Sequence, residues 1–550
     1  MKSKIISKMP VCADDLTLGE KIGQLICGRY FDDMPLLEDL LKKGLIGALT
    51  PSCIAKSLSE TIDYINHFQQ ISKYPLFIGF GNVSFSGGTD FAPLAYMRIG
   101  AARSAELAYL YGKITTKESR AAGFHIIGLP NFDVNTNPLN PIINTRSLGD
   151  NAELVAELAL ETCRGILDEK GLTCAMHFPG HGDTAHDTHI AVAVVEKSIK
   201  EMEETELLPY QKALNNNLLN GICTNHIYYP ALEKEKNLPA TFSKNIITGL
   251  LRNKMQYKGI IMSDSLTMKA VKDSYGIEES AVRAIEAGHD IILQDYASDP
   301  RITIEALMKA VNSGRINEKQ INDSVNRILN TKWQLGIFQN KTVSKEHALA
   351  VCNSTEHQAI ASRVAYESVT VLENNGLPLN RNSELKSLCI SNGSFLEENA
   401  DWETVHEPAN DMFYNSVKKQ IPDTANLIFR DTFSEKELNN ILLAAKSYPL
   451  IIIALFTRVR CYHEDSIYIA PKYKSLIQNI LNLKKKTVII NYGNPYACKY
   501  FSDADILMCT YSDCNASIKA SVDILFGEKK ASGRLPVKIS DTYYFGYGLK

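Results

Sequence analysis

Residues 176–189, with the sequence MHFPGHGDTAHDTH, place four histidines and two aspartates within fourteen residues. Gly180 and Gly182 allow tight backbone turns, and Pro179 prevents a helix from running into them. The apolar residues 172–176 before the turns predict a buried strand. The segment is therefore expected to form a polar loop at the end of a strand, where α/β enzymes carry their chemistry.

A metal site is the first interpretation to weigh for this loop. His177, His181, His186 and His189 follow one another at intervals of four, five and three residues, without the Glu of a helical H-E-x-x-H zinc motif. The glycines and the proline also disfavour a helix that would place two imidazoles on one face. We therefore predict no metal and no other cofactor. A second interpretation, preferred for His181, is that the histidines only cap and hydrogen-bond the loop.

The third interpretation is proton transfer by Asp187 and His189. The aspartate lies two residues before the histidine. A carboxylate so close to an imidazole can orient the ring and raise its basicity. A general acid/base that works near neutral pH needs both effects.

The run HFPGHGDT followed by Asp-x-His closely resembles the signature of bacterial β-N-acetylglucosaminidases of glycoside hydrolase family 3. This resemblance implies that Asp187 and His189 form the acid/base dyad. Residues 140–147 look like the family's Asn-Pro…Arg-Ser segment. Residues 261–268, IMSDSLTM, look like its nucleophile strand, which implies that Asp264 is the nucleophile. The resemblance covers nearly the whole chain.

The resemblance implies a retaining exo-β-glycosidase that removes an N-acetylhexosamine-type sugar through a covalent glycosyl-aspartate. Such an enzyme needs a carboxylate nucleophile and an acid/base group on either side of the scissile bond. Asp264 follows the apolar residues 259–263, which predict a strand. The alternative role for Asp264 is to cap the next helix, a common task for Asp at such a junction.

The family match also implies residues that bind the sugar. Arg146 would donate to sugar hydroxyls, since its guanidinium presents donors in a fixed fork, although a structural ion pair is the alternative. His177 follows the strand end and would bind another hydroxyl. His226, after a later strand, is expected to line the pocket, but a lone histidine there is more often structural.

Two positions depart from the family pattern. Met176 stands where the family carries Lys, and residues 79–88 hold no acid where the family has Asp-x-Glu-Gly-Gly. In the family both charged side chains hold sugar hydroxyls, and each such bond contributes about 1.5–3 kcal/mol. We therefore hypothesise an altered glycon, deoxygenated or substituted, with Met176 and Phe80 supplying apolar contact.

Other functions remain open at this stage. A catalytically degenerate family member could bind a glycan or a protein partner without turnover, although the retained dyad and nucleophile argue against it. Some relatives are phosphorylases, in which phosphate replaces water. The β-glucosidase and β-xylosidase branches generally lack the histidine loop, so its presence counts against them.

The composition is that of an ordinary globular protein. Its 550 residues exceed the 250–300 or so that one core supports, so more than one domain is expected. A net charge of -3 gives no argument for nucleic acid or membrane. We expect a small carbohydrate or glycoconjugate as the only partner and leave the oligomeric state open.

The twelve cysteines are scattered without a C-x-x-C pair, so neither a zinc ribbon nor a disulfide framework is indicated. Residues 1–15 lack the apolar core of a signal peptide. No stretch approaches the roughly 18 apolar residues of a membrane helix. These features favour the cytoplasm.

Strand and helix patterns alternate before residue 340, which favours a TIM-type (β/α)8 barrel over an open doubly wound sheet. Helices are expected at residues 18–26, 151–170 and 199–215, and the first strand at 44–49. A second α/β pattern begins at residue 369 and resembles the family's C-terminal sandwich domain. The predicted organisation is a catalytic barrel at 1–340, a helical linker at 341–368 and an α/β/α sandwich at 369–550.

Overall fold

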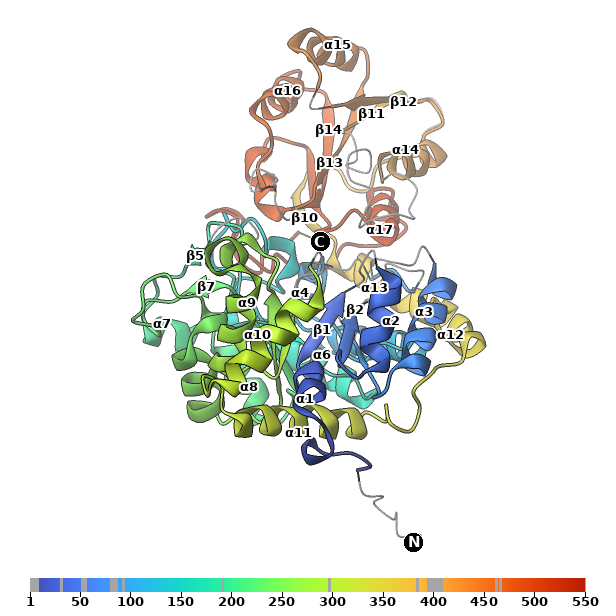
Figure 1. The fold of residues 1–550 in the computed structure, drawn as a ribbon. Helices are drawn as coiled ribbons and strands as arrows, with labels where there is room; N and C mark the ends of the chain where they lie inside the picture. The colour runs from blue at the N-terminus through green and yellow to red at the C-terminus, as the bar shows by residue number, and fades with distance from the viewer. Residues whose placement is uncertain are drawn as a thin grey trace.

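The fold was determined as a computed structural model. The residues it describes are 9–29, 33–50, 57–79, 88–91, 94–188, 192–294, 298–381, 385–392, 409–430, 432–459, 463 and 467–549. The chain forms a barrel, blue to yellow in Figure 1, and a smaller C-terminal unit, orange to red, stacked on one end of it.

Short parallel strands form the wall of the barrel. They are β1 (Ile26–Arg29), β2 (Ala48–Thr50), β3 (Phe77–Ile78), β4 (Ala175–Phe178), β6 (Gly221–Thr224), β8 (Ile260–Ser265) and β9 (Ile291–Leu293). Their order is β3-β2-β1-β9-β8-β6-β4. Residues 124–132 join the two ends, since Ile126 N donates to Ile78 O at 3.0 Å and Phe132 N donates to Met176 O at 2.7 Å. The predicted TIM-type barrel is confirmed.

Helices cover the outside of the barrel. Several of them begin with a capping residue whose side chain accepts a backbone N–H of the first helical turn. These capping residues are Thr17, Ser57, Ser104 and Asn151. None of the described helices is long and apolar enough to cross a membrane. The barrel helices are α1 (Leu18–Gln24), α2 (Met34–Lys42), α3 (Leu58–Ile71), α4 (Met97–Ala102), α5 (Ala105–Ala121), α6 (Ala152–Asp168), α7 (Ile199–Glu204), α8 (Leu208–Asn215), α9 (Lys269–Ala287), α10 (Pro300–Asn312) and α11 (Glu318–Gln334), with a π-helix at Asn245–Lys254 and a two-stranded pair of β5 (Ala193–Val194) and β7 (Ile227–Tyr228).

Two element predictions were wrong. The first strand is β1, not residues 44–49, because α1 ends at Gln24 and the apolar run that follows it fits helix and strand equally well. The single helix expected at 199–215 is divided into α7 and α8. Thr205 between them leaves helical geometry at φ -125° and ψ -86°, and a proline opens α8.

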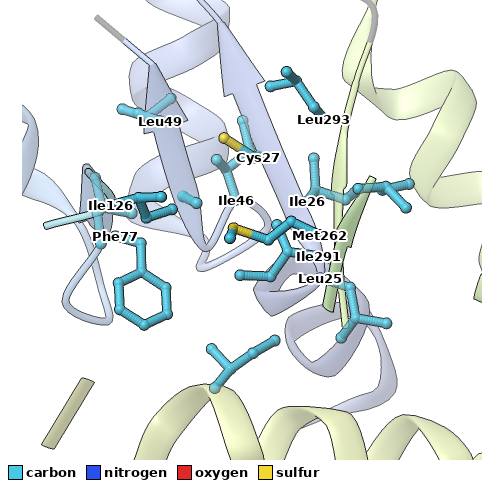
Figure 2. Close-up of a cluster of buried hydrophobic side chains, with 14 of the residues drawn as sticks. Leu25, Ile26, Cys27, Ile46, Leu49, Phe77, Ile126, Met262, Ile291 and Leu293 are labelled. Atoms are coloured by element: carbon cyan, nitrogen blue, oxygen red, sulfur yellow. The ribbon is translucent and has the colours of Figure 1, made fainter. Parts of the chain in front are cut away.

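Apolar side chains from successive strands meet inside the barrel (Figure 2). Cys27, Leu49, Phe77, Met262 and Ile291 are all buried there. Each large side chain of this kind contributes about 1.5–3 kcal/mol when it leaves water. This packing fixes the strands whose far ends carry the polar residues described below.

The C-terminal unit is a six-stranded sheet in the order β10-β15-β14-β13-β11-β12, with β10 antiparallel to β15 and the other pairs parallel. It confirms the predicted second α/β unit, whereas the boundaries at 340 and 369 stay predictions. The elements are α12 (Lys345–Val351), α13 (Thr355–Ser368), β10 (Thr370–Asn374), β11 (Ser387–Asn392), α14 (Ala409–Gln420), β12 (Thr424–Phe429), α15 (Glu435–Ala445), β13 (Leu450–Thr457), α16 (Pro471–Leu481), β14 (Lys486–Gly493), the 3₁₀ helix η8 (Pro495–Tyr500), β15 (Ile506–Cys509) and α17 (Asn515–Leu525).

Lys332 is a fully buried cation at the end of the barrel where the strands begin. Its Nζ donates to Gln24 Oε1 at 2.7 Å and to Gly47 O at 2.8 Å, and lies 5.1 Å from the centre of the Phe77 ring. Both hydrogen-bond acceptors are neutral, so desolvation lowers the pKa of Lys332 to about 7.

In the wild type, the free energy of unfolding is expected to rise with pH because of Lys332, and Lys332→Met should abolish this rise. Between about pH 7 and the unfolded lysine pKa of about 10.4, the unfolded chain binds more protons at this site than the folded chain. The wild-type free energy of unfolding therefore gains up to about 1.4 kcal/mol per pH unit from this group. Urea unfolding at pH 7 and pH 9 would show a smaller gain in the variant. The surface variant Lys319→Met should keep the wild-type gain. A gain between pH 7 and pH 9 in Lys332→Met that equals the wild-type gain would contradict the prediction.

Candidate active site

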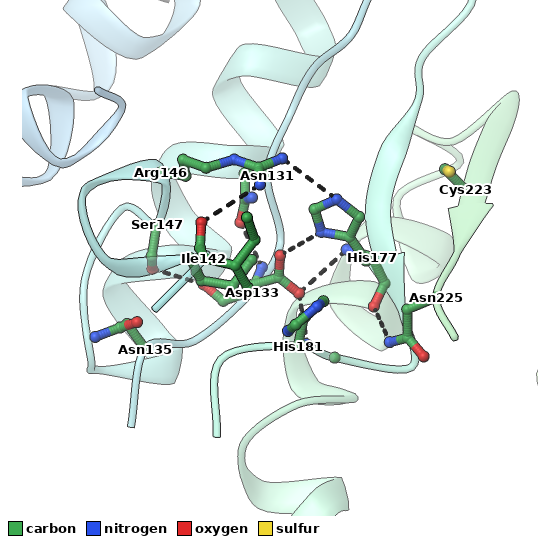
Figure 3. Close-up of polar contacts among 12 residues, drawn as sticks. Asn131, Asp133, Asn135, Ile142, Arg146, Ser147, His177, His181, Cys223 and Asn225 are labelled. Carbon is green, nitrogen blue, oxygen red and sulfur yellow. Dashed lines mark hydrogen bonds and ion pairs between the residues drawn. The ribbon is translucent and has the colours of Figure 1, made fainter. Parts of the chain in front are cut away.

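A buried carboxylate, Asp133, lies at the centre of the polar cluster in Figure 3. Its Oδ2 is 2.7 Å from His177 Nδ1, and its Oδ1 accepts the backbone N–H groups of His177 at 3.1 Å and His181 at 2.7 Å. Burial alone would raise the pKa of Asp133, but the charge and hydrogen bonds of His177 outweigh it and hold the pKa at about 2. Asp133 is therefore ionised at neutral pH.

His177 and Arg146 extend this cluster towards the barrel mouth. The ionised Asp133 can only accept a hydrogen bond, so a neutral His177 ring carries its proton on Nδ1. The other ring nitrogen of His177, Nε2, is then a hydrogen-bond acceptor. Arg146 Nη2 lies 3.5 Å from that Nε2, and Nη1 donates to Ile142 O at 3.3 Å. Arg146 Nε has no hydrogen-bond partner within the described part of the chain. The guanidinium thus retains donor capacity that a bound hydroxyl could use.

Asp264 lies near the carboxyl end of β8 and is half-buried. Its Oδ1 accepts the N–H of Ser265 at 2.7 Å. β6 and β8 are neighbours in the sheet, with Cys223 level with Met262. Asn225 directly follows β6, and its Nδ2 donates to His177 O at 2.9 Å, which connects β6 to the Asp133 cluster.

The topology of the parallel sheet places the two aspartates at the same end of the barrel. β4 and β8 both run parallel to β6, which lies between them. Their carboxyl ends, which carry His177 with its partner Asp133 and Asp264, therefore lie at one mouth of the barrel.

The loop after β4 packs closely against residues 132–140. A Cβ on Gly182 would lie 1.8 Å from Val134 O, so only glycine fits at this approach. Asn137 Nδ2 donates to Asp183 O at 3.1 Å, and Asn140 Nδ2 donates to His181 O at 2.8 Å. These contacts fix the first half of the loop as a rigid support for the residues that follow.

His181 holds the loop from inside, which confirms the structural role preferred for it. Its ring nitrogens lie 3.0 Å from Thr184 Oγ1 and 3.1 Å from Thr188 Oγ1. Burial lowers its pKa to about 4, so the ring is neutral near pH 7. The neighbouring Asp187 is fully buried. His189 lies outside the described residues.

Lys197 anchors the chain on the far side of the loop. Its Nζ contacts Glu206, donates to Thr136 Oγ1 at 3.0 Å and lies 3.5 Å from Asp183 Oδ1. Glu206 is fully buried and also receives a hydrogen bond from Thr205. The loop is thus attached to the barrel on both of its sides, by amide hydrogen bonds from Asn137 and Asn140 on one side and by the ion pairs of Lys197 on the other.

The predicted sugar-binding residues separate into two groups. Arg146, His177 and the half-buried Met176 lie together beside Asp133. His226, by contrast, is fully buried, with Nδ1 2.8 Å from Thr241 Oγ1 and Nε2 2.9 Å from Ser265 O. Both ring nitrogens are bonded within the protein, so these contacts support the turn beside Asp264 and do not support a role in sugar binding. Phe80 and the segment 80–87 lie outside the described residues.

Sequence reasoning missed Asp133 and Asn225. Asp133 lies between the apolar residues Phe132 and Val134, where a lone carboxylate signals a buried charge that needs partners. Asn225 stood beside His226 and received no role. Among the described residues, no three His, Cys, Asp or Glu side chains are grouped to hold a metal ion.

Asp133→Asn should lower both stability and activity. Asparagine keeps only one acceptor oxygen for the three donors that meet Asp133, and each buried donor left without a partner costs about 1–3 kcal/mol. The substitution also releases the His177 ring. The contribution of the Asp133 carboxylate to the free energy of unfolding is fully present above its unfolded pKa of about 3.9. It is lost as pH falls towards its folded pKa of about 2. Urea unfolding should therefore show a large difference from wild type at pH 6 and a smaller one at pH 3. Asp299→Asn, which removes an exposed pair with Arg301, is the control; an equal Asp133→Asn deficit at both pH values would contradict this account.

Comparison with known proteins places this geometry in a family. The glycosyl hydrolase family 3 N terminal domain matches residues 17–331, and the family's C-terminal domain matches residues 369–544. Beta-hexosaminidase A of Pseudoalteromonas piscicida is 28% identical over 464 residues, covering 77% of this chain and 75% of that protein. Beta-hexosaminidase of Neisseria meningitidis serogroup C is 31% identical over 268 residues, covering 48% and 68%.

A solved structure agrees over nearly the whole chain. The family 3 beta-N-acetylglucosaminidase from Paenibacillus sp. is 28% identical with a TM-score of 0.84, covering 96% of this chain and 99% of that one. The family matches span both units of the fold. The chain belongs to glycoside hydrolase family 3.

Proposed function

We propose that this chain is a retaining exo-β-glycosidase that releases a β-linked N-acetylhexosamine-type sugar through a covalent bond to Asp264. The observation that carries the proposal is the shared barrel mouth. Asp264 lies near the carboxyl end of β8, at the same end of the parallel sheet as β4 and the Asp133 cluster, and the Asp187 loop packs against residues 132–140. The names of the related hexosaminidases support the sugar class.

The proposed reaction has two steps. Asp264 attacks the anomeric carbon while protonated His189 gives its proton to the leaving oxygen, so the C–O bond to the aglycone breaks as the bond to the carboxylate forms. Asp187 stabilises the imidazolium. Neutral His189 then takes a proton from water, whose oxygen displaces Asp264 and releases the sugar.

Arg146 and His177 would bind the sugar hydroxyls in both steps. Asp133 fixes the His177 ring through Nδ1, so Nε2 faces Arg146 with a defined orientation. A rigid acceptor beside a guanidinium can receive and give hydrogen bonds to neighbouring hydroxyls without reorganising. Asp133 acts through His177 and is therefore a positioning residue.

A cytoplasmic location and a small glycoside or glycoconjugate substrate belong to the same proposal. The cysteines that the structure describes are free, and most are buried. Free thiols of this kind suit a reducing compartment.

Asp264→Asn should reduce turnover of a nitrophenyl β-glycoside by at least about a thousandfold, since the amide cannot form the intermediate. The panel would contain the N-acetylglucosaminide, glucoside and xyloside, each with and without phosphate. Asp273→Asn, an exposed carboxylate on α9, is the matched control and should retain wild-type rates. A 2-fluoro glycoside should label Asp264 in the wild type. Binding without turnover by the wild type would favour a degenerate glycan-binding protein instead.

The glycon itself is proposed to differ from ordinary N-acetylglucosamine. Met176 is half-buried against the apolar barrel interior and immediately precedes His177, where family members place a lysine. A thioether offers no hydrogen bond to a hydroxyl and favours an apolar group in its place. A sugar deoxygenated or substituted at that position fits this lining.

Met176→Lys should shift the preference back towards the ordinary sugar. The ratio of kcat/KM for N-acetylglucosaminide over its 6-deoxy analogue should rise about tenfold or more, because a charged hydrogen bond to a hydroxyl contributes about 1.5–3 kcal/mol. Met176→Leu is the matched control and should leave the ratio unchanged. A wild-type preference for the N-acetylglucosaminide over its 6-deoxy analogue would contradict the altered-glycon hypothesis.

A further inference from the structure

A pocket of about 450 Å³ lies at the end of the barrel where the strands begin. Lys117 and Arg120, near the C-terminal end of α5, line one wall, and His125 follows them at the start of the next strand segment. His347 of α12 and the residues before it line the other wall. This volume is in the range of small-molecule sites. The proposed glycosidase chemistry does not use the pocket, because Asp264 lies at the opposite end of the strands.

Both walls of the pocket are held in place by hydrogen bonds. Asn66 of α3 exchanges two of them with Val343, since its Nδ2 donates to Val343 O and its Oδ1 accepts from Val343 N, both at 2.9 Å. Lys341 Nζ donates to Ser72 O at 2.9 Å. The segment that leads into α12 is therefore fixed against the barrel, and the pocket is formed before any ligand binds.

Arg120 brings an uncompensated cation to this pocket. Its Nη2 donates to the neutral Leu335 O at 2.8 Å, and its Nη1 is buried without a hydrogen-bond partner in the described part of the chain. Burial lowers the pKa of Arg120 to about 10, so the guanidinium is still charged at neutral pH. A desolvated cation with an unused donor is costly unless an acceptor of opposite charge meets it.

His125 adds a donor whose position is fixed. Its Nδ1 accepts the backbone N–H of Ile78 at 3.0 Å, so a neutral ring carries its proton on Nε2. Burial, followed by the charges of Arg120 and Lys332, lowers the pKa of His125, which keeps the ring neutral near pH 7. The Nε2–H group is thus available to an acceptor in a region of positive potential.

The remaining charged groups leave the pocket positive. The exposed Lys117 is a second cation, and Glu169 is the one acidic side chain among the described residues of the lining. Glu169 Oε1 lies 4.0 Å from Lys113 Nζ, outside the pocket. A phosphoryl group suits this set of donors, because a phosphate monoester carries a charge of about -1.5 to -2 at pH 7 and presents three strong acceptor oxygens.

We propose that this pocket binds the phosphoryl group of inorganic phosphate or of a small phosphate monoester, with Arg120 Nη1, His125 Nε2–H and Lys117 as its donors. The inference is independent of the proposed glycosidase function, since these residues lie at the opposite end of the barrel from Asp264. It assigns to them a role in ligand binding and none in bond cleavage.

Calorimetric titration of the full chain with inorganic phosphate and with glucose 6-phosphate, at constant ionic strength, tests the proposal. Arg120→Gln should weaken the binding of both ligands about tenfold or more, because it removes a charged donor that the protein leaves unpaired. Lys117→Gln changes an exposed side chain and should weaken binding about two- to fivefold with the fold intact. Lys319→Gln, on the exposed face of α11, is the matched control and should keep the wild-type affinity.

The two ligands distinguish the sources of the phosphoryl group. Tighter binding of glucose 6-phosphate would assign the rest of the pocket to the group that the ester carries, whereas tighter binding of inorganic phosphate would assign the site to the free ion. Both ligands should also raise the Tm of the wild type, and the rise should be smaller in Arg120→Gln and in Lys117→Gln.

Arg146→Gln separates this pocket from the barrel mouth, where another guanidinium could meet phosphate. Its affinity for both ligands should equal that of the wild type. Loss of binding in Arg146→Gln, with wild-type affinity in Arg120→Gln and Lys117→Gln, would overturn the proposal. It would also be overturned if neither ligand bound the wild type or raised its Tm.

Discussion

The buried carboxylate of Asp133 is the constraint on which the rest of the site depends. A charge with no access to water is tolerated only when several donors meet it, and here the His177 ring and the backbone N–H groups of His177 and His181 do so. These bonds cannot form unless residues 132–140, β4 and the start of the loop occupy fixed relative positions. The need to satisfy one charge thus orders His177 and the first half of the loop after β4 together.

Buried charges at the two ends of the barrel serve different purposes. Lys332, where the strands begin, is held only by neutral acceptors and costs stability. Asp133, where they end, is paired with a histidine that faces the site. In TIM barrels polar groups at the strand ends serve chemistry, whereas the opposite face serves stability. The Asp133 cluster follows this division.

Family membership covers both units of the fold, whereas substrate recognition depends on local contacts. In the proposed function Asp264 and the Asp187 loop carry the reaction, and Met176 stands next to His177 where the family pattern has a charged group. The C-terminal unit contacts the segment that supports the loop through Asn135 and Tyr496. Specificity can differ within one fold because binding contacts are separable from the groups that move protons and electrons.

The sequence by itself determined the barrel, the second α/β unit and the segments that carry the chemistry, because strand and helix periodicity and the HFPGHGDT run are local signals. It placed Arg146 and His177 in one site. It could not reveal Asp133, since an aspartate in an apolar strand acquires its role only from donors 44 and 48 residues away. It also assigned His226 to the pocket, whereas packing turned both ring nitrogens to Thr241 and Ser265. The register of β6 and β8 and the contact between the two units arise from tertiary packing, which brings together groups that no local pattern relates.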